Sequence, residues 1–357
     1  MHIGVDAREL AGHRTGVGRY LLRLLEQWGV NPAARRHRFT LFVPRLDATL
    51  PGGLPGDIAV VEGAGGTLWE QGALARALRR ASPDVFFAPG YTAPLLSRTP
   101  FVVTVHDVSF AAHPEWFRRR EAVRRRWLAR AAVTRARSIV TVSEFSRQEI
   151  VRLLGAAAER VHVVTHGVDA AAGPPAAREP LVLYVGSIFT RRHVPVLIEA
   201  FARLARDRPE LRLTLVGEDR SWPPVLLARA IDRSGVRERI RHVGWVPDIE
   251  LASLYARASA FVFLSSYEGF GLTPLEALAA GVPPVVLDTP VAREIYGSAS
   301  IRVGAPDPSV VARALASALD EGPVRSGVLA AAGPVLARYR WSAAAEQTLS
   351  LLEGVTR

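Results

Sequence analysis

The sequence predicts an α/β protein built from two doubly wound parallel sheets. Three observations lead to this prediction. Short apolar runs alternate with amphipathic segments along the chain, which is typical of strands and helices in turn. A stretch rich in alanine, glycine and proline interrupts this alternation near the middle. Finally, 357 residues that are 49% hydrophobic suffice for two cores.

The first half begins with a predicted strand at residues 2–5. Next comes a helical stripe that contains Tyr20 and Trp28, and further helices are predicted at 68–81 and 116–137. The remaining apolar runs of this half are short enough to be strands, and they cover residues 39–43, 85–88, 101–105, 139–142 and 161–165.

The break lies at residues 170–180, where glycine and three prolines occur without periodicity. The alternation then resumes with a helix near 194–204 and with strands at 181–185, 211–216, 240–243, 260–264 and 284–287. We therefore predict a first domain at 1–172, a linker at 173–180 and a second domain at 181–338. The end, 339–357, contains one more helix, which can pack on either domain.

The composition limits the classes of protein to consider. The chain has a net charge of +11, carried entirely by arginine, and it contains no cysteine. A solvated basic surface and an attraction to anions explain the charge equally well; the anions include nucleotide diphosphates, phospholipid headgroups and nucleic acid. The first ten residues hold three charges, and no apolar run is long enough to span a membrane. We expect a cytoplasmic protein, or one peripheral to the inner face of a membrane.

Ligands of such sheets bind beyond the carboxyl ends of the strands, so the residues that follow each strand are the candidates for a site. After the first strand, Gly16 and Gly18 open a helix whose N-terminus favours an anion, although a simple tight turn explains them as well. His106 and Asp107 follow the strand at 101–105. The imidazole of His106 is suited to donate to a sugar hydroxyl or to a developing negative charge, or it has a structural role, hydrogen-bonded to a neighbour.

Three more strand ends carry candidates in the second half. Gly186 and Ser187 follow the strand at 181–185, and Arg191 and Arg192 come next, where guanidinium groups suit a diphosphate. Two other strand ends supply Gly217 and, as an apolar wall for a nucleobase, Val246. Ordinary loop packing and solvent-facing arginines are the competing interpretations.

The strongest group follows the strand at 260–264. A glycine-containing loop there leads into a helix and presents backbone N–H groups to an anion through Gly269, Phe270, Gly271, Leu272 and Thr273. Thr273 suits the N-cap and Pro274 the first helical position. Glu276 then completes a capping box or, alternatively, accepts hydrogen bonds from two sugar hydroxyls. Glu268 has no capping role, and we expect it to face ligand or solvent.

These segments resemble glycosyltransferase family 4, whose signature of two glutamates with seven residues between them matches Glu268 and Glu276 in YEGFGLTPLEALAAGVPPVV. Other matching segments are DARELAGHRTGVGRY, VTVHDVSFAAHPEWF, HGVD and YVGSIFTRRHVPVLIEAF, which look like their counterparts in bacterial mannosyl- and rhamnosyltransferases of surface polysaccharide assembly. The resemblance implies the GT-B fold, in which two Rossmann-like domains face a cleft, the first on the acceptor side and the second binding the nucleotide sugar. It also implies that the last helix packs back on the first domain.

The resemblance assigns roles to the residues. Glu276 would bind the ribose hydroxyls, and Glu268 and His106 would contact the transferred sugar. Arg191 and Arg192 would neutralise the leaving diphosphate. The backbone of residues 270–273 would hold sugar and diphosphate, and Gly16 and Gly18 would close over the phosphates. Many relatives have arginine where Ser187 stands and lysine where Arg192 stands, so the division of labour between the arginines stays open.

The resemblance implies hexosyl transfer, with mannose favoured, from a nucleoside diphosphate sugar with retention of configuration. The acceptor is a glycan, a lipid-linked molecule or a small molecule. No Asp-x-Asp pair occurs, so neither a metal nor another cofactor is expected. The aromatic and basic segment at 116–127 suits contact with an anionic membrane, or it is a solvated helix face. Alternatives are a sugar-nucleotide epimerase, a phosphorylase-like enzyme and, without enzymatic activity, a basic nucleic-acid-binding or scaffold protein.

Overall fold

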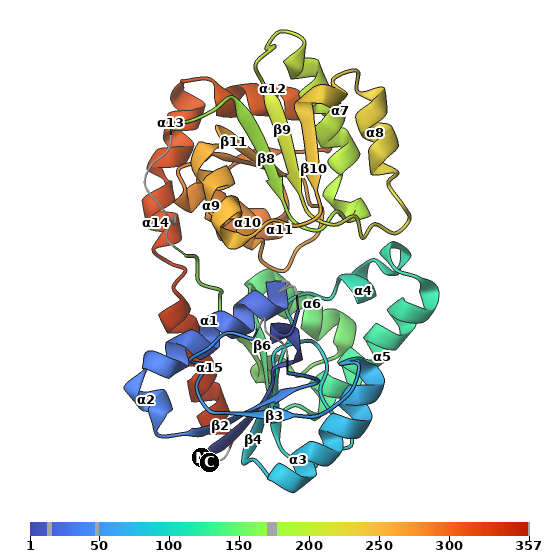
Figure 1. The fold of residues 1–357 in the computed structure, drawn as a ribbon, viewed down its shortest axis with the longest axis vertical. Coiled ribbons are helices and arrows are strands. Elements are labelled where there is room, and N and C mark those ends of the chain that lie inside the picture. The colour runs from blue at the N-terminus through green and yellow to red at the C-terminus, as the bar shows by residue number, and fades with distance from the viewer. Residues whose placement is uncertain (13–15, 47–49, 170–176, 356–357) are drawn as a thin grey trace. The chain divides into compact units, whose positions relative to one another are not determined.

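The computed structural model describes residues 1–12, 16–46, 50–169 and 177–355. The chain forms two compact units. Unit 1 comprises Met1–Ala112, Arg120–Gly167 and Arg340–Arg357, and unit 2 comprises His113–Arg119 and Val168–Tyr339. Figure 1 shows a sheet with helices on both faces in each unit. Each unit is therefore a parallel-sheet α/β domain, as predicted. Residues 173–176 of the predicted linker lie outside the described residues.

Unit 1 contains a seven-stranded sheet in the order β3-β2-β1-β4-β5-β6-β7, and all neighbouring strands run parallel. The strands are β1 His2–Asp6, β2 Arg38–Val43, β3 Asp57–Val60, β4 Val85–Ala88, β5 Phe101–Thr104, β6 Ser138–Thr141 and β7 Val161–Val163. The helices are α1 Gly16–Val30, α2 Pro32–Arg35, a π-helical turn Trp69–Leu74 that continues into α3 Ala75–Ala81, α4 Ser109–Ala112, α5 Arg119–Arg135, α6 Glu144–Leu154 and α15 Trp341–Gly354.

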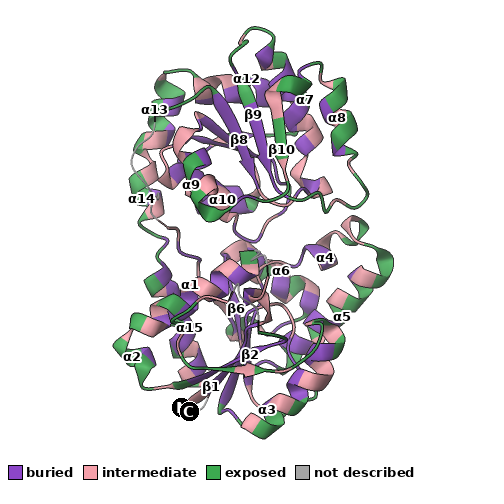
Figure 2. Cartoon of the chain, in the orientation of Figure 1, coloured by how far each residue is buried: buried purple, intermediate pink, exposed green. Residues whose placement is uncertain are grey.

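The last helix, α15, belongs to unit 1. Its Ala345 carbonyl accepts a hydrogen bond of 2.9 Å from Trp28 Nε1 of α1. Trp28 is 1% exposed and stacks on Phe39 of β2 with ring centroids 5.5 Å apart. Figure 2 shows mostly buried strands in this sheet, whereas the surrounding helices mix buried and exposed residues. One buried indole thus joins α1, α15 and the sheet.

Unit 2 contains a six-stranded parallel sheet in the order β10-β9-β8-β11-β12-β13. Its strands are β8 Leu181–Val185, β9 Arg212–Val216, β10 Ile240–Val243, β11 Ala260–Phe263, β12 Pro284–Leu287 and β13 Ile301–Val303. Its helices are α7 Val194–Ala205, α8 Leu227–Arg233, α9 Asp248–Arg257, α10 Leu272–Ala279, α11 Pro290–Tyr296, α12 Pro308–Leu319, α13 Pro323–Ala330 and α14 Ala332–Leu336. The strand order reverses between β8 and β11, so the loops after these two strands frame the usual ligand position of such a sheet.

Candidate active site

The loops after β8 and β11 meet in unit 2 through an ion pair whose side chains are 12% and 14% exposed. Arg192 Nε donates to Glu268 Oε1 at 2.8 Å, and Arg192 Nη1 donates to the Ser187 carbonyl at 2.7 Å. Burial alone would lower the pKa of Arg192, but the Glu268 carboxylate more than offsets this and raises that pKa above its usual value. Arg192 is therefore permanently charged and fixed in place.

Glu268 has a structural partner that the sequence did not reveal. Its side chain is only 14% exposed, and its Oε1 also accepts from Ser265 Oγ at 2.8 Å. We expected Glu268 to face ligand or solvent, and this expectation is wrong for Oε1, which binds Arg192 and Ser265. Its Oε2 makes no hydrogen bond to any residue in the described part of the chain.

Arg191 lies beside this pair in a different environment. Its Nε donates to the Tyr267 carbonyl at 3.1 Å, and its guanidinium carbon lies 4.3 Å from the ring centroid of Phe189. The residue is 7% exposed. Its two terminal nitrogens have no hydrogen-bond acceptor among the described residues, in contrast to Nη1 of Arg192. Arg191 therefore keeps a pair of donors for an anion.

The helix after the glycine-containing loop begins earlier than predicted. α10 starts at Leu272, and its N-cap is Gly271, whose φ is 84°. The prediction of Thr273 as the N-cap and Pro274 as the first helical residue is therefore wrong, and the capping box does not form in the predicted frame. The reason is conformational: the left-handed backbone at Gly271 turns the chain into the helix two residues sooner.

Tyr296 of α11 holds the start of α10 from one side. Its hydroxyl lies 2.9 Å from the Gly271 carbonyl and 3.3 Å from the Phe270 carbonyl. A Cβ at position 271 would collide with this hydroxyl, so only glycine fits there. In a trans peptide the N–H points opposite to the C=O. Because both carbonyls face Tyr296, the N–H groups of Gly271 and Leu272 point away from it and form a cradle for an anion.

Tyr255 of α9 holds the second glutamate. Its buried hydroxyl donates to Glu276 Oε2 at 2.8 Å. Glu276 itself is partly exposed. The structure thus adds a partner from a neighbouring helix that neither use proposed from the sequence, capping or ligand binding, included. Tyr255 and Tyr296 lie 21 and 25 residues from their acceptors, so no local signal in the sequence could identify them.

The glycines after β8 and β9 have a packing role. A Cβ on Gly217 would collide with the Gly186 carbonyl, and a Cβ on Gly186 would come within 2.7 Å of Arg192 Nη1. Both glycines have positive φ, at 143° for Gly186 and 150° for Gly217. They are needed where two loops and the Arg192 side chain approach closely. After β10, Val246 is buried, whereas Trp245 and Ile249 are 55% and 87% exposed.

The carboxyl end of β5 carries His106 in unit 1. Its Nε2 lies 2.9 Å from the Pro89 carbonyl, which can only accept, so Nε2 carries the proton. Burial lowers the pKa of His106 below its usual value, although the bond to Pro89 and the charge of Asp107 act in the opposite direction. His106 is therefore a neutral imidazole. Asp107 accepts from the Ser109 backbone N–H at 2.8 Å and so caps α4.

A cluster of rings surrounds His106. Tyr20 of α1 meets it edge-on with ring centroids 4.9 Å apart, and His166 lies 5.3 Å from it. Trp341 of α15 packs 5.7 Å from His166. Burial and the neighbouring His106 lower the pKa of His166 well below the usual 6.5. The sequence did not predict that two histidines 60 positions apart share one buried cluster.

The remaining candidates lie at the start of α1. This helix begins at Gly16, as predicted, and Gly18 is buried. Residues 13–15 of the preceding loop lie outside the described residues. Within the described ranges, no three histidine, aspartate or glutamate side chains are grouped so that they could hold a metal ion. No described helix is long and apolar enough to cross a membrane.

Two family models match the chain in succession. Residues 14–172 match Glycosyltransferase Family 4, and residues 169–330 match Glycosyl transferases group 1. The chain is 30% identical over 290 residues to O-antigen chain mannosyltransferase B of Escherichia coli, covering 77% of this chain and 75% of that protein. It is 33% identical over 255 residues to glycogen synthase of Mycobacterium tuberculosis, covering 68% of this chain and 58% of that larger protein.

Solved structures agree on the fold. The structure of Anabaena HepE in complex with UDP-glucose is similar with a TM-score of 0.78 and 18% identity, and 99% of both chains is covered. WaaG, a glycosyltransferase involved in lipopolysaccharide biosynthesis, is similar with a TM-score of 0.76 and 18% identity, covering 99% of this chain and 100% of that one. Together with the two glutamates and the sheet topology, these matches show that the chain belongs to glycosyltransferase family 4 and has the GT-B fold.

Proposed function

We propose that this glycosyltransferase moves a hexosyl group, with mannose favoured, from a nucleoside diphosphate sugar to a glycan, a lipid-linked molecule or a small molecule, with retention of configuration. The observation that carries the proposal is the group formed by Arg191, Arg192 and Glu268 beside the N–H groups at the start of α10. The most similar relatives include a mannosyltransferase, and HepE was solved with UDP-glucose.

The transition state of glycosyl transfer places growing negative charge on the leaving diphosphate and positive charge on the sugar ring. Donors that are fixed before the reaction stabilise such charge without reorganisation. Arg191 offers two terminal nitrogens that no described residue occupies, and Gly271 and Leu272 offer aligned N–H groups. We assign the diphosphate to these donors. Arg192 supplies charge and holds Glu268, so it is chiefly a positioning residue.

The two glutamates take different parts of the donor in this proposal. Glu276, oriented by Tyr255, accepts hydrogen bonds from the ribose hydroxyls. Glu268 keeps Oε1 on Arg192 and Ser265 and turns Oε2 to a hydroxyl of the transferred sugar. The exposed Trp245 and the buried Val246 after β10 form an apolar surface for the base. Neither glutamate is assigned as a nucleophile; the leaving phosphate is the group that takes the acceptor proton.

His106 contributes a neutral ring in unit 1. Because its Nε2–H is bound to the Pro89 carbonyl, Nδ1 is the nitrogen left without a proton. A contact to the donor sugar through Nδ1 would accept from a hydroxyl. This differs from the donating role that the sequence suggested. The reaction needs no metal in this proposal, since arginine side chains and N–H groups carry the diphosphate charge.

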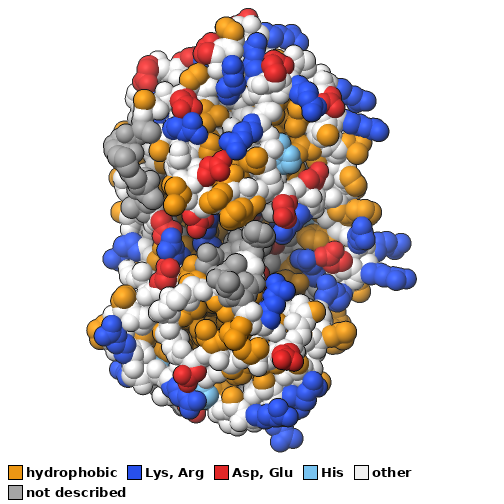
Figure 3. All heavy atoms as spheres, in the orientation of Figure 1, with side chains coloured by type: hydrophobic (Ala, Val, Ile, Leu, Met, Phe, Trp, Pro, Cys, Tyr) orange, Lys and Arg blue, Asp and Glu red, His pale blue; other side chains and the backbone are white. Residues whose placement is uncertain are grey.

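We also propose that the enzyme is cytoplasmic and rests on the inner face of a membrane through α5. Val123 and Trp127, one turn apart on α5, are 69% and 64% exposed, and arginines flank them. Figure 3 shows basic side chains gathered near the segment that leads into α5. Aromatic and basic residues on one exposed surface suit an anionic lipid interface.

A donor panel tests the proposal. The purified chain is incubated with GDP-mannose, UDP-glucose, dTDP-rhamnose and ADP-glucose, with and without simple glycoside acceptors and EDTA. We expect acceptor-dependent release of nucleoside diphosphate from one donor, no effect of EDTA, and a product whose anomeric configuration by NMR equals that of the donor. Conversion of the donor sugar without acceptor would favour an epimerase, and inversion would contradict the proposed mechanism.

The glutamates provide the matching variants. Glu276→Gln should weaken donor binding by roughly tenfold, because a ribose hydroxyl loses a charged acceptor. Glu268→Ala should abolish most transfer while nucleoside diphosphate binding is largely kept. Unchanged donor affinity and turnover in Glu276→Gln would return that residue to a structural role.

A further inference from the structure

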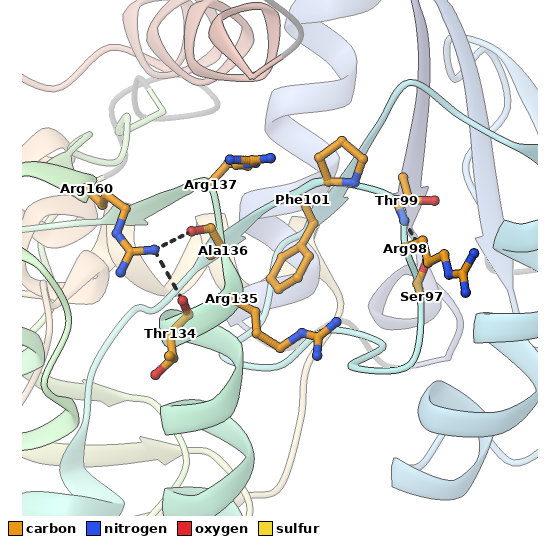
Figure 4. Close-up of a pocket in the computed structure, with 10 residues that line it drawn as sticks. Ser97, Arg98, Thr99, Phe101, Thr134, Arg135, Ala136, Arg137 and Arg160 are labelled. Carbon is orange, nitrogen blue, oxygen red and sulfur yellow. Dashed lines mark hydrogen bonds between the residues drawn. The ribbon is translucent and has the colours of Figure 1, made fainter.

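Besides the arginines of unit 2, the protein has a second basic site, which lies in unit 1 at the amino end of its sheet. The segments that lead into β5, β6 and β7 surround a pocket of about 500 Å³. Its lining residues are Ser97, Arg98, Thr99, Pro100, Phe101, Thr134, Arg135, Ala136, Arg137 and Arg160. Figure 4 shows the four arginines distributed around the ring of Phe101. The pocket thus combines four guanidinium groups with no acidic lining residue.

The pocket is built from fixed parts. Arg160 Nη1 donates to the carbonyls of Thr134 and Ala136, at 3.2 and 3.0 Å, and Figure 4 marks both bonds. The Arg137 backbone N–H donates to the Phe101 carbonyl at 3.0 Å. Phe101 is 4% exposed. The segments that carry the arginines are therefore held to each other before any ligand arrives.

The positive charge of this pocket is not neutralised within the protein. None of its four arginines forms an ion pair with a carboxylate among the described residues. Elsewhere in the same unit arginines find acidic partners, as Arg8 does in Asp6 and Arg147 in Glu144. Uncompensated guanidinium groups around a concave surface attract anions.

The helix dipole explains only part of this arrangement. Arg135 is the last residue of α5, and Arg160 binds two carbonyls at the end of this helix, so both positions suit a helix C-terminus. Arg98 and Arg137 lie in the segments before β5 and β6 and cap no helix. Both arginines are exposed and line the pocket without a capping role.

The pocket is separate from the candidate active site of unit 1. Pro100 precedes β5 and His106 follows it, so six residues of extended chain, roughly 20 Å, separate the two ends. A ligand at the amino end cannot take part in the chemistry at the carboxyl end of the same strand.

We propose that this pocket binds a phosphate-bearing anion as a second ligand site, outside the donor and acceptor positions. Planar guanidinium groups bind phosphate oxygens in pairs, and two or more of them from different segments select a doubly charged group over chloride. The phosphate belongs either to a soluble phosphorylated molecule or to a lipid headgroup, and both present the same chemistry to Arg98 and Arg137.

Residue-resolved arginine modification tests the proposal. The full chain is treated with phenylglyoxal, and the modification rate of each arginine is measured by peptide mass spectrometry. One arm adds inorganic pyrophosphate at constant ionic strength. A second arm adds vesicles of phosphatidylcholine with or without phosphatidylglycerol. We expect protection of Arg98, Arg135 and Arg137 in at least one arm, and the arm that protects them identifies the source of the phosphate.

Two matched variants complete the design. R98Q/R137Q removes two charges from the pocket, and R79Q/R80Q removes two exposed charges from the last turn of α3, outside the pocket. We expect pyrophosphate or vesicle binding at this site to fall roughly tenfold in the first and to stay unchanged in the second. In the same experiment, protection of Arg191 and Arg192 measures binding at the donor site. The proposed function and the pocket proposal can therefore be refuted separately. Equal loss in both variants, or no protection in either arm, would overturn the pocket proposal.

Discussion

The carboxyl ends of the two sheets carry opposite kinds of cluster. In unit 1, β5 ends at His106, which packs with Tyr20, His166 and Trp341 and is neutral. In unit 2, β8 leads to Arg192, which is permanently charged beside Glu268. Both clusters are largely shielded from solvent, but the histidines of the first are neutral, whereas the second holds an arginine paired with a glutamate. The difference matches the proposed division of labour, in which unit 2 stabilises a diphosphate and unit 1 presents uncharged groups to sugars.

The largest expected effect comes from breaking the charged pair. Arg192→Gln leaves Glu268 buried with one uncompensated charge, and losing one partner of a buried pair costs about 3–5 kcal/mol of unfolding free energy. We expect a large loss of stability and of transfer in this variant, measured by chemical denaturation and donor turnover.

The double variant R192Q/E268Q is its control. Removing both charges should restore most of the unfolding free energy but not the transfer activity. Recovery of activity along with stability would show that the pair is only structural.

Arg191→Gln should separate chemistry from stability. Arg191 has no close carboxylate of its own, since its Nε lies 4.0 Å from Glu268 Oε1, so its removal leaves no carboxylate unpaired. The Tyr267 carbonyl, which loses the bond from Arg191 Nε, keeps the one from Ser265 Oγ. Loss of a preorganised donor to a developing charge reduces kcat by about 10²–10³-fold. Nucleoside diphosphate affinity, measured by calorimetry, should fall more in Arg191→Gln than in Glu268→Ala. Equal nucleotide affinity in wild type and Arg191→Gln would mean that Arg191 does not bind the phosphates.

The neutral cluster predicts an acid-sensitive unit 1. His106 and His166 have pKa values below the usual 6.5, so at lower pH the unfolded chain binds more protons than the folded one. The stability that the two neutral histidines contribute to the folded state is complete above pH 6.5 and is lost progressively as the pH falls below that value. Hydrogen exchange followed by mass spectrometry at falling pH should show unit 1 opening before unit 2. His166→Asn should reduce this difference between the units. If the variant opens at the same pH as the wild type, His166 does not cause the acid sensitivity.

The smallest effect is expected from a single hydroxyl. Tyr296→Phe removes the group that faces the carbonyls of Phe270 and Gly271 but keeps the ring. One hydrogen bond of this kind is worth about 1 kcal/mol, which corresponds to a roughly fivefold loss of kcat/KM. Tyr339→Phe is the matched control, because its hydroxyl binds the Ile295 carbonyl and not the loop. Equal losses in both variants would indicate a general effect on α11.

Eleven strands of the structure were predicted from apolar runs, and they include all the central strands of both sheets and the edge strands β7 and β10. The missed strands, β3 and β13, are edge strands, and their exposed residues break the apolar pattern. Of the site, the chain positions of Arg191, Arg192, Glu268 and Glu276 followed from strand ends and the family signature. Their partners did not, because Arg192 meets Glu268 across 76 residues and only the fold brings them together.

The start of α10 shows why a local rule failed. Thr273 and Pro274 satisfy the preferences for a helix start, but Gly271 adopts a left-handed conformation beside Tyr296 and begins the helix earlier. A long-range contact thus overrides a capping preference worth about 1 kcal/mol. The same contact aims the N–H groups that the proposed function requires.

Hydrogen exchange with bound nucleotide tests the central claim most directly. The nucleoside diphosphate that gives the largest thermal shift is added to the wild-type chain, and protection is mapped by mass spectrometry. We predict that the strongest protection falls in unit 2, at residues 186–192 and 265–276. Protection confined to unit 1, or no thermal shift with any nucleoside diphosphate, would contradict the assignment of the donor to the charged cluster.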